Sequence, residues 1–158
     1  MSNGATVTAS PGMYILLGGG LQISGGSTLN GTGVTFFNMD GGTYGGYKPL
    51  AISGTSSTSL IAPTSGPYTG LLFWQDPNLP SGFYNQQNAI SGTSSTVFQG
   101  VLYFPNSPLV YSGQSTNNAA YTIMVADTLT FSGGAALNSN FSSLSGGNPI
   151  KTGAIVAE

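Results

Sequence analysis

The chain has 158 residues, enough for one domain that buries roughly two-thirds of its unfolded surface. Only 4% of the residues are charged, while 39% are hydrophobic and 11% aromatic, so we expect an apolar core beneath an uncharged surface and not a disordered chain. The net charge of −2 excludes a basic nucleic-acid interface, and the lack of histidine and cysteine excludes disulfides, thiolate metal sites and a Ser-His-Asp triad.

Residues 1–11 are expected to form an N-terminal lead-in. They contain neither the basic region nor the apolar run of a signal peptide. No stretch of the chain approaches the roughly 20 apolar residues of a membrane span. We therefore expect no membrane span, and an excised domain of an exported protein.

A short motif, Leu-x-aliphatic or aromatic-Ser-Gly, recurs five times from residue 21 onward. The copies are Leu21–Gly25, Leu50–Gly54, Asn88–Gly92, Leu109–Gly113 and Leu129–Gly133, spaced by 29, 38, 21 and 20 residues. Apolar residues at the first and third positions predict a strand with one buried face. The glycine after serine predicts a tight turn.

Short aromatic-rich runs lie between these motifs. They are Gly33–Phe37, Gly70–Trp74 and Gly100–Phe104, with weaker copies at Tyr121–Val125 and Gly153–Val156. Runs that are apolar on both faces predict strands covered on both sides. A further strand is expected at each of Thr28-Leu29, Ser59-Leu60 and Val97-Phe98. Residues 100–113 align with 120–133 without a gap, which indicates a structural repeat.

The spacing predicts an all-β chain, a right-handed parallel β-helix (solenoid) of about five coils that forms one domain over residues 1–158. Stacked coils would place one apolar residue of each motif in an internal column, namely Ile23, Ile52, Ile90, Tyr111 and Phe131. The alternative is a β-sandwich, which has strands at similar spacing but gives no reason for identical pentapeptides. Three stretches are expected to project as insertions: 38–49, 62–69 and 75–87.

The insertions supply the residues that we expect to contact a ligand or partner. These are Tyr44, Tyr47, Trp74, Asp76, Phe83 and Tyr84. Trp74 with its neighbouring amides suits stacking against a glycan, and the alternative is packing beneath the 77–83 loop. Asp40 and Asp76 follow equivalent strands, either as the carboxylate pair that a glycosidase requires or as solvated turn residues.

We expect no enzyme and no cofactor, with a weak calcium site at Asp40 or Asp76 as the alternative, because calcium needs only oxygen ligands. Hydroxyl pairs follow four of the Ser-Gly turns, at Ser27-Thr28, Ser57-Thr58, Ser95-Thr96 and Ser115-Thr116. On an exposed face they would form a ladder that orders water, as in ice-binding solenoids, or simply suit an exposed strand. Terminal coils without charged caps would favour self-assembly into a filament.

Four segments resemble the C-terminal region of TadG-like proteins from bacterial tight-adherence (Flp-type) pilus-assembly systems. They are residues 12–25 (GMYILLGGGLQISG), 62–76 (APTSGPYTGLLFWQD), 100–105 (GVLYFP) and 125–133 (VADTLTFSG). The resemblance covers nearly the whole chain. It implies an extracellular or cell-envelope location, relatives with an N-terminal membrane anchor that is absent here, and no catalytic residues.

The sequence therefore predicts a non-catalytic structural or adhesion module of the bacterial cell envelope or exterior, related to pilus assembly. Its expected partners are proteins, further copies of itself or surface glycans, and not nucleic acid. The alternatives are a self-assembling extracellular fibre subunit and a carbohydrate- or ice-binding module.

Overall fold

The computed structural model describes residues 1–139, which run repeatedly through three sheets. Sheet A contains β1 (Thr6–Ala9), β4 (Thr28–Thr32), β7 (Ser57–Ile61), the first half of β10 (Ser95–Phe104), β12 (Thr116–Ala119) and β15 (Ala136–Ser139). Sheet B contains β2 (Gly12–Leu17), β5 (Val34–Met39), β8 (Leu71–Gln75), the second half of β10 and β13 (Thr122–Ala126). Sheet C contains β3 (Leu21–Ile23), β6 (Leu50–Ile52), β9 (Asn88–Ile90), β11 (Leu109–Tyr111) and β14 (Leu129–Phe131).

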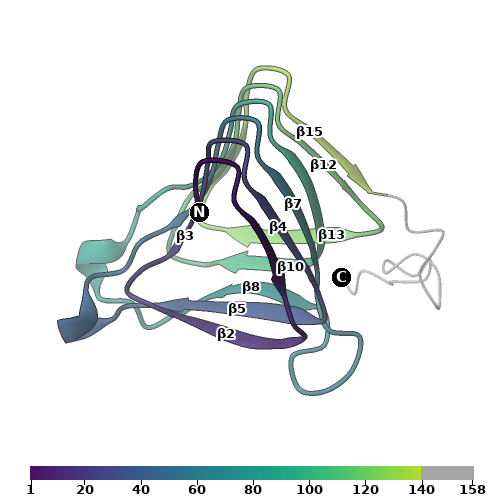
Figure 1. Cartoon of the computed structure of the whole chain (residues 1–158). Coiled ribbons are helices and arrows are strands. Elements are labelled where there is room, and N and C mark those ends of the chain that lie inside the picture. Colours follow the sequence, from purple (N-terminus) through teal and green to yellow (C-terminus); the bar gives the residue numbers. More distant parts are fainter. Residues whose placement is uncertain (140–158) are drawn as a thin grey trace, which may run out of the picture.

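Each repeat of the chain contributes one stretch of strand to sheet A, then to sheet B, then to sheet C, and pairs with the next repeat. β10 runs through the corner and joins sheets A and B into one curled ten-stranded sheet. Figure 1 looks along the stack and shows the three sheets as the sides of a triangle. All strand pairs in residues 1–139 are parallel, which excludes for this region the antiparallel hairpins of a β-sandwich.

The register of sheet C confirms that the five predicted residues form one column, in which four are internal and Phe131 is 41% exposed. Ile23 pairs with Ile52, Ile52 with Ile90, Ile90 with Tyr111, and Tyr111 with Phe131. The first four side chains are at most 1% exposed. Sheets A and B add further buried side chains to this core, such as Phe98 and Leu102. The apolar residues at alternate positions of each motif therefore face the interior.

The recurring Ser-Gly turn has a steric cause. Gly92 has a φ of +76°, and a Cβ atom there would lie 2.7 Å from the carbonyl oxygen of Gly54. Gly113 has a φ of +70°, and its Cβ would lie 2.6 Å from the carbonyl oxygen of Gly92. Each glycine thus lies against the glycine of the previous repeat, in a conformation that L-residues rarely adopt, so any side chain is excluded.

The hydroxyl pairs are divided between the two faces of sheet A. Half of them are buried, namely Ser27, Thr58, Thr96 and Ser115. The other half pair in register on the outside, namely Thr28, Ser57, Ser95 and Thr116. Neighbouring residues of a strand point to opposite faces, so a pair cannot stay whole on one face. Each repeat therefore contributes one hydroxyl side chain to the exposed ladder, and not the expected two.

Three details differ from the sequence expectations. The proposed lead-in 1–11 contains β1, which pairs with β4 in sheet A. The segments between strands cover residues 40–49, 62–70 and 76–87, so the insertions differ by one or two residues from 38–49, 62–69 and 75–87. The gapless alignment fails in sheet B, where Gly100 pairs with Thr122, because the corner before β13 is longer and the corner after it shorter than in the previous repeat.

We expect Gly92→Ala to destabilise the protein by more than about 2 kcal/mol, because the positive φ and the close backbone oxygen both oppose a Cβ. Gly82 is the matched control, since it has no positive φ and nothing lies within 4 Å of the position that a Cβ atom would take there. Gly82→Ala should change stability by less than about 0.5 kcal/mol. Chemical denaturation measures both, and equal midpoints for the two variants would contradict the steric argument.

The Tyr111 phenol is buried and its hydroxyl has no hydrogen-bond partner. Burial raises the pKa of Tyr111 above its usual range. The unfolded chain releases this proton near pH 10 and the folded chain retains it, so the associated stability is present below about pH 10 and is lost at higher pH.

We therefore expect Tyr111→Phe to be at least as stable as the parent protein at pH 7 and to lose less stability at about pH 10.5. Denaturant titrations at the two pH values measure this difference. An identical alkaline loss in both proteins would show that Tyr111 does not carry the effect.

Candidate functional site

The outer face of sheet B carries one apolar side chain from each strand at the same level. Paired residues define this apolar row: Ile15 with Phe37, Phe37 with Trp74, Trp74 with Tyr103, and Tyr103 with Val125. Adjacent members are one strand spacing apart, about 4.8 Å. The row therefore crosses all five strands of the sheet at a right angle to their direction.

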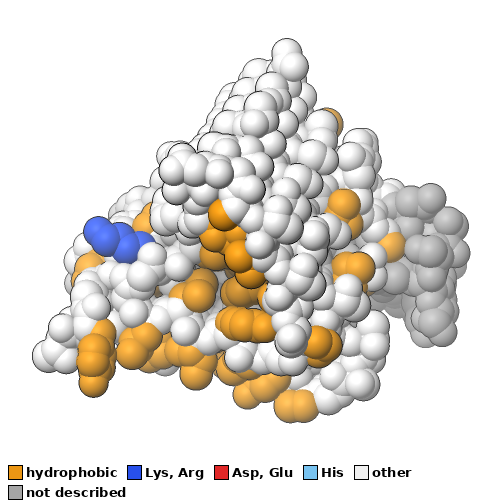
Figure 2. All heavy atoms as spheres, in the orientation of Figure 1, with side chains coloured by type: hydrophobic (Ala, Val, Ile, Leu, Met, Phe, Trp, Pro, Cys, Tyr) orange, Lys and Arg blue, Asp and Glu red, His pale blue; other side chains and the backbone are white. Residues whose placement is uncertain are grey.

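The apolar row points outward because the residues beside it point inward. Phe36, Phe73 and Phe104 are buried in the core, and strand alternation places their neighbours on the opposite face. Ile15 is 60% exposed and Val125 is 42% exposed, whereas the three aromatic members are partly buried. Figure 2 shows hydrophobic side chains gathered along the lower edge of the molecule, where Figure 1 places β2 and β5.

Further apolar residues widen this face on both sides of the row. Leu17 and Ile123 are 45% and 43% exposed, and Met13 and Val101 are partly buried. The sequence predicted that the doubly apolar strands would be covered on both sides. The residues of the runs 71–74 and 101–104 are buried or partly buried, whereas Ile15 and Leu17 of β2 and Ile123 and Val125 of β13 are exposed on the outer face.

Two rings form the centre of the row. The centroids of Phe37 and Trp74 lie 4.6 Å apart with their planes tilted by 44°. A bulge in β8 precedes Trp74 and leaves Leu72 and Phe73 both buried, so the alternation resumes with Trp74 outside. Trp74 therefore packs against Phe37 of the neighbouring strand.

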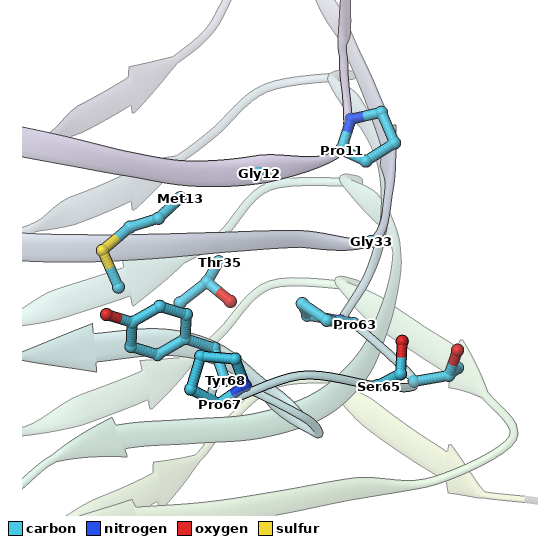
Figure 3. A pocket seen from close by; sticks show the side chains of 10 residues that line it. Pro11, Gly12, Met13, Gly33, Thr35, Pro63, Ser65, Pro67 and Tyr68 are labelled. Carbon is cyan, nitrogen blue, oxygen red and sulfur yellow. The ribbon is translucent and has the colours of Figure 1, made fainter.

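A pocket of about 420 Å³ lies beside one end of the row. Its walls come from the first residues of β2 and β5 and from the loop over residues 62–70. In Figure 3, Thr35 lies between Met13 and Tyr68 on one side and Pro63 on the other. The Thr35 hydroxyl donates to the carbonyl oxygen of Leu71 at 2.7 Å, so it forms a fixed floor.

The pocket and the row share an uncharged chemistry. The pocket is lined by Pro11, Gly12, Met13, Gly33, Thr35, Pro63, Thr64, Ser65, Pro67 and Tyr68. Neither this lining nor the row contains a charged side chain. Rings, proline faces and hydroxyls are the groups that this surface offers to a ligand.

The insertions pack mainly against each other. Tyr47 is 1% exposed, and its ring centroid lies 6.4 Å from that of Phe83. Gln75 is fully buried and its Nε2 donates to the Tyr47 hydroxyl at 2.9 Å and to Ser107 Oγ at 2.6 Å. Burial raises the pKa of Tyr47 despite these hydrogen bonds. Tyr47, expected as a contact, is inaccessible because it forms the small core of the insertions.

The other predicted contact residues are accessible but scattered. Tyr44 ends the 3-10 helix η1 (Gly42–Tyr44) and is 82% exposed. Tyr84 follows η2 (Ser81–Phe83) and is 41% exposed. Asp76 accepts a hydrogen bond from the backbone N–H of Asn78 at 2.9 Å, as a turn residue does. Only Trp74 of the predicted set belongs to the apolar row.

Asp40 and Asp76 follow β5 and β8, at the same corner of the triangle. Asn38 pairs with Gln75, so Asp76 lies in register with residue 39 and not with Asp40. One oxygen of Asp40 is buried without a hydrogen-bond partner. Within residues 1–139, no group of three or more Asp, Glu, His or Cys residues lies close enough together to hold a metal ion.

The sequence prediction placed the contact residues in the insertions and missed the row. The available signal was the run apolar on both faces, repeated at Phe36-Phe37, Phe73-Trp74 and Val101–Phe104. Comparisons with family models, with curated proteins and with solved structures gave no match. Among the described residues, no helix has the length and apolar character needed to cross a membrane.

Gln75 ties the insertions to the sheet, so we expect Gln75→Leu to be destabilising by about 2–4 kcal/mol. The substitution leaves the Tyr47 hydroxyl, Ser107 Oγ and the Asn106 N–H without their shared partner. Gln99→Leu is the matched control, since Gln99 lies partly exposed in β10. Denaturant titration measures both, and a harmless Gln75→Leu would mean that the insertions are held by other contacts.

Proposed function

We propose that the chain is a right-handed parallel β-helix of about five coils that serves as a non-catalytic structural or adhesion module of the bacterial cell envelope or exterior. The resemblance to TadG-like proteins suggests a relation to pilus assembly. One observation carries the proposal: the apolar row stays exposed on a scaffold whose repeats are stacked in register. The largest apolar patch on a protein surface is often functional.

The scaffold supports this function by its stiffness. Stacked repeats pair along the whole height of each sheet, and the glycine column allows no side chain between them. The row is thereby held flat, without a loop that must order on contact. A preorganised surface binds without the entropic cost of ordering its side chains, which suits a module that attaches to another surface.

The test measures adhesion of beads coated with the chain, under flow, to bacterial cells and to a plain hydrophobic surface. We expect Ile15→Ser combined with Val125→Ser to reduce retention severalfold, because both substitutions remove exposed apolar area from the row. The control combines Tyr44→Ser with Tyr84→Ser, which remove exposed aromatic side chains from the insertions. Retention of parent-coated beads no better than that of albumin-coated beads would overturn the adhesion proposal.

A self-assembling fibre subunit is the second candidate. β14 is the last strand of sheet C among the described residues, and its Leu129 and Phe131 are 48% and 41% exposed. End-to-end stacking of copies would cover them with another strand. Light scattering with negative-stain microscopy over a concentration series separates the two candidates, since filaments favour the fibre and a 16.0 kDa monomer excludes it.

A further inference from the structure

The last described repeat exposes side chains that face the interior of the stack. Phe131 and Leu137 are 41% and 38% exposed. Their partners one repeat earlier, Tyr111 and Asn117, are fully buried. The register is the same at both levels, so the difference comes from the repeat that follows Tyr111 and Asn117. A further repeat of the same kind is therefore what covers these positions within the molecule.

The first repeat shows the same exposure at the opposite end. Val7 pairs with Leu29, which is 4% exposed and belongs to the core, so Val7 also faces the interior. Val7 is nevertheless 43% exposed, because β1 is the first strand of sheet A. Val7 and Leu137 are the first and last described members of one inward column of sheet A. Each end thus lacks the neighbour that the other end can supply.

From these two ends we propose that copies of the chain stack head to tail, with β1 of one copy paired in parallel on β15 of the next. Sheet A would continue across the joint, and Thr6 of one copy would lie in register with Ala136 of its neighbour. The inference rests on the second candidate function, the self-assembling subunit. It specifies which strands meet and in what register.

The end strands of sheet A have no protection against such pairing. The edge strand of a sheet usually carries charged residues, proline or a bulge that prevents pairing with another chain. β1 (TVTA) and β15 (ALNS) contain neither a charged residue nor a proline, and their pairings with β4 and β12 show no bulge. Both strands have four residues, so they also match in length.

Sheet C can continue through the same joint. The Ser24 N–H donates to the carbonyl oxygen of Met1 at 3.0 Å, and the Met1 amino group donates to that of Gln22 at 2.6 Å. Met1 is therefore in register with Ile23, and it packs against the core. In the stack Met1 would meet Phe131, the last member of the same column. Sheet B has one described strand fewer than sheet A, so the inference concerns sheets A and C.

The cross-section of the stack favours the joining of unlike ends. Strands of the three sheets differ in length, with four residues in β1, six in β2 and three in β3. Joining two like ends requires a two-fold axis, which brings one sheet against itself but places the second sheet against the third. A shift along the stack keeps every sheet above itself and every pair parallel. Such a head-to-tail joint does not close, so it generates filaments.

Cysteine pairs test the joint, because the chain has no cysteine of its own. Within one copy Thr6 and Ala136 lie five strand spacings apart, about 24 Å, whereas one spacing of about 4.8 Å separates them across the joint. A disulfide needs a Cα separation of about 4.4–6.8 Å, so it can form only between copies. We expect oxidised Thr6→Cys/Ala136→Cys to give a ladder of dimers, trimers and higher multimers on non-reducing gels.

Two matched controls separate the joint from random collision. Thr6→Cys/Tyr44→Cys replaces the second position by an 82% exposed residue of the insertions, and should give at least tenfold less multimer. Leu137→Lys places an unpaired charge in the joint and should lower the fraction of assembled protein at least tenfold. Tyr44→Lys adds the same charge away from the ends and should leave assembly unchanged. Circular dichroism verifies that each variant retains the fold.

Each outcome decides between the joint and the function on which it rests. A ladder from the Thr6–Ala136 pair that the control pair lacks supports the joint. Filaments in negative-stain microscopy without this disulfide overturn the proposed register and leave a self-assembling subunit. Assemblies that stop at dimers show that like ends meet, and they also overturn the joint. Monomers at every concentration overturn both the joint and the fibre candidate, while the bead assay still decides the adhesion proposal.

Discussion

The structure depends on in-register stacking of one repeat of backbone on the next. Every described strand pairs in parallel with the strand of a neighbouring repeat, and the turn glycines at 54, 92, 113 and 133 lie against one another. Such contact requires backbone at the same position in each repeat and no Cβ between them. This requirement explains why each of the five recurring pentapeptides ends in glycine.

Stacking in register also aligns the outward side chains of successive repeats, so that equivalent positions form rows across the sheets. Hydroxyl side chains form one row on sheet A, and apolar side chains form another on sheet B. Charged residues in such a row would lie about 4.8 Å apart and repel by roughly 1–4 kcal/mol per pair. With only 4% charged residues the chain avoids this repulsion, and its outward rows consist of apolar and hydroxyl side chains.

The insertions are packed into a small core of their own, whereas the outer face of sheet B carries the apolar row. Tyr47, Phe83 and Gln75 close the insertions into a small core at one corner, which fills space beside sheet B. Among residues 1–139, the loop over residues 62–70 lies beside the face and walls its pocket. If the chain is the adhesion module that we propose, a flat surface on a stacked scaffold would add weak contacts with each strand.

The sequence alone determined the parallel repeat, the in-register column at Ile23, Ile52, Ile90, Tyr111 and Phe131, of which the first four are internal, and the glycine turns. These features are local, since alternation and the conformation of glycine are properties of a few adjacent residues. Only the tertiary structure decided that residues 6–9 complete sheet A, that Tyr47 is buried and that the apolar row is open. A run that is apolar on both faces has the same sequence whether or not another segment covers it, because coverage depends on where distant insertions fold.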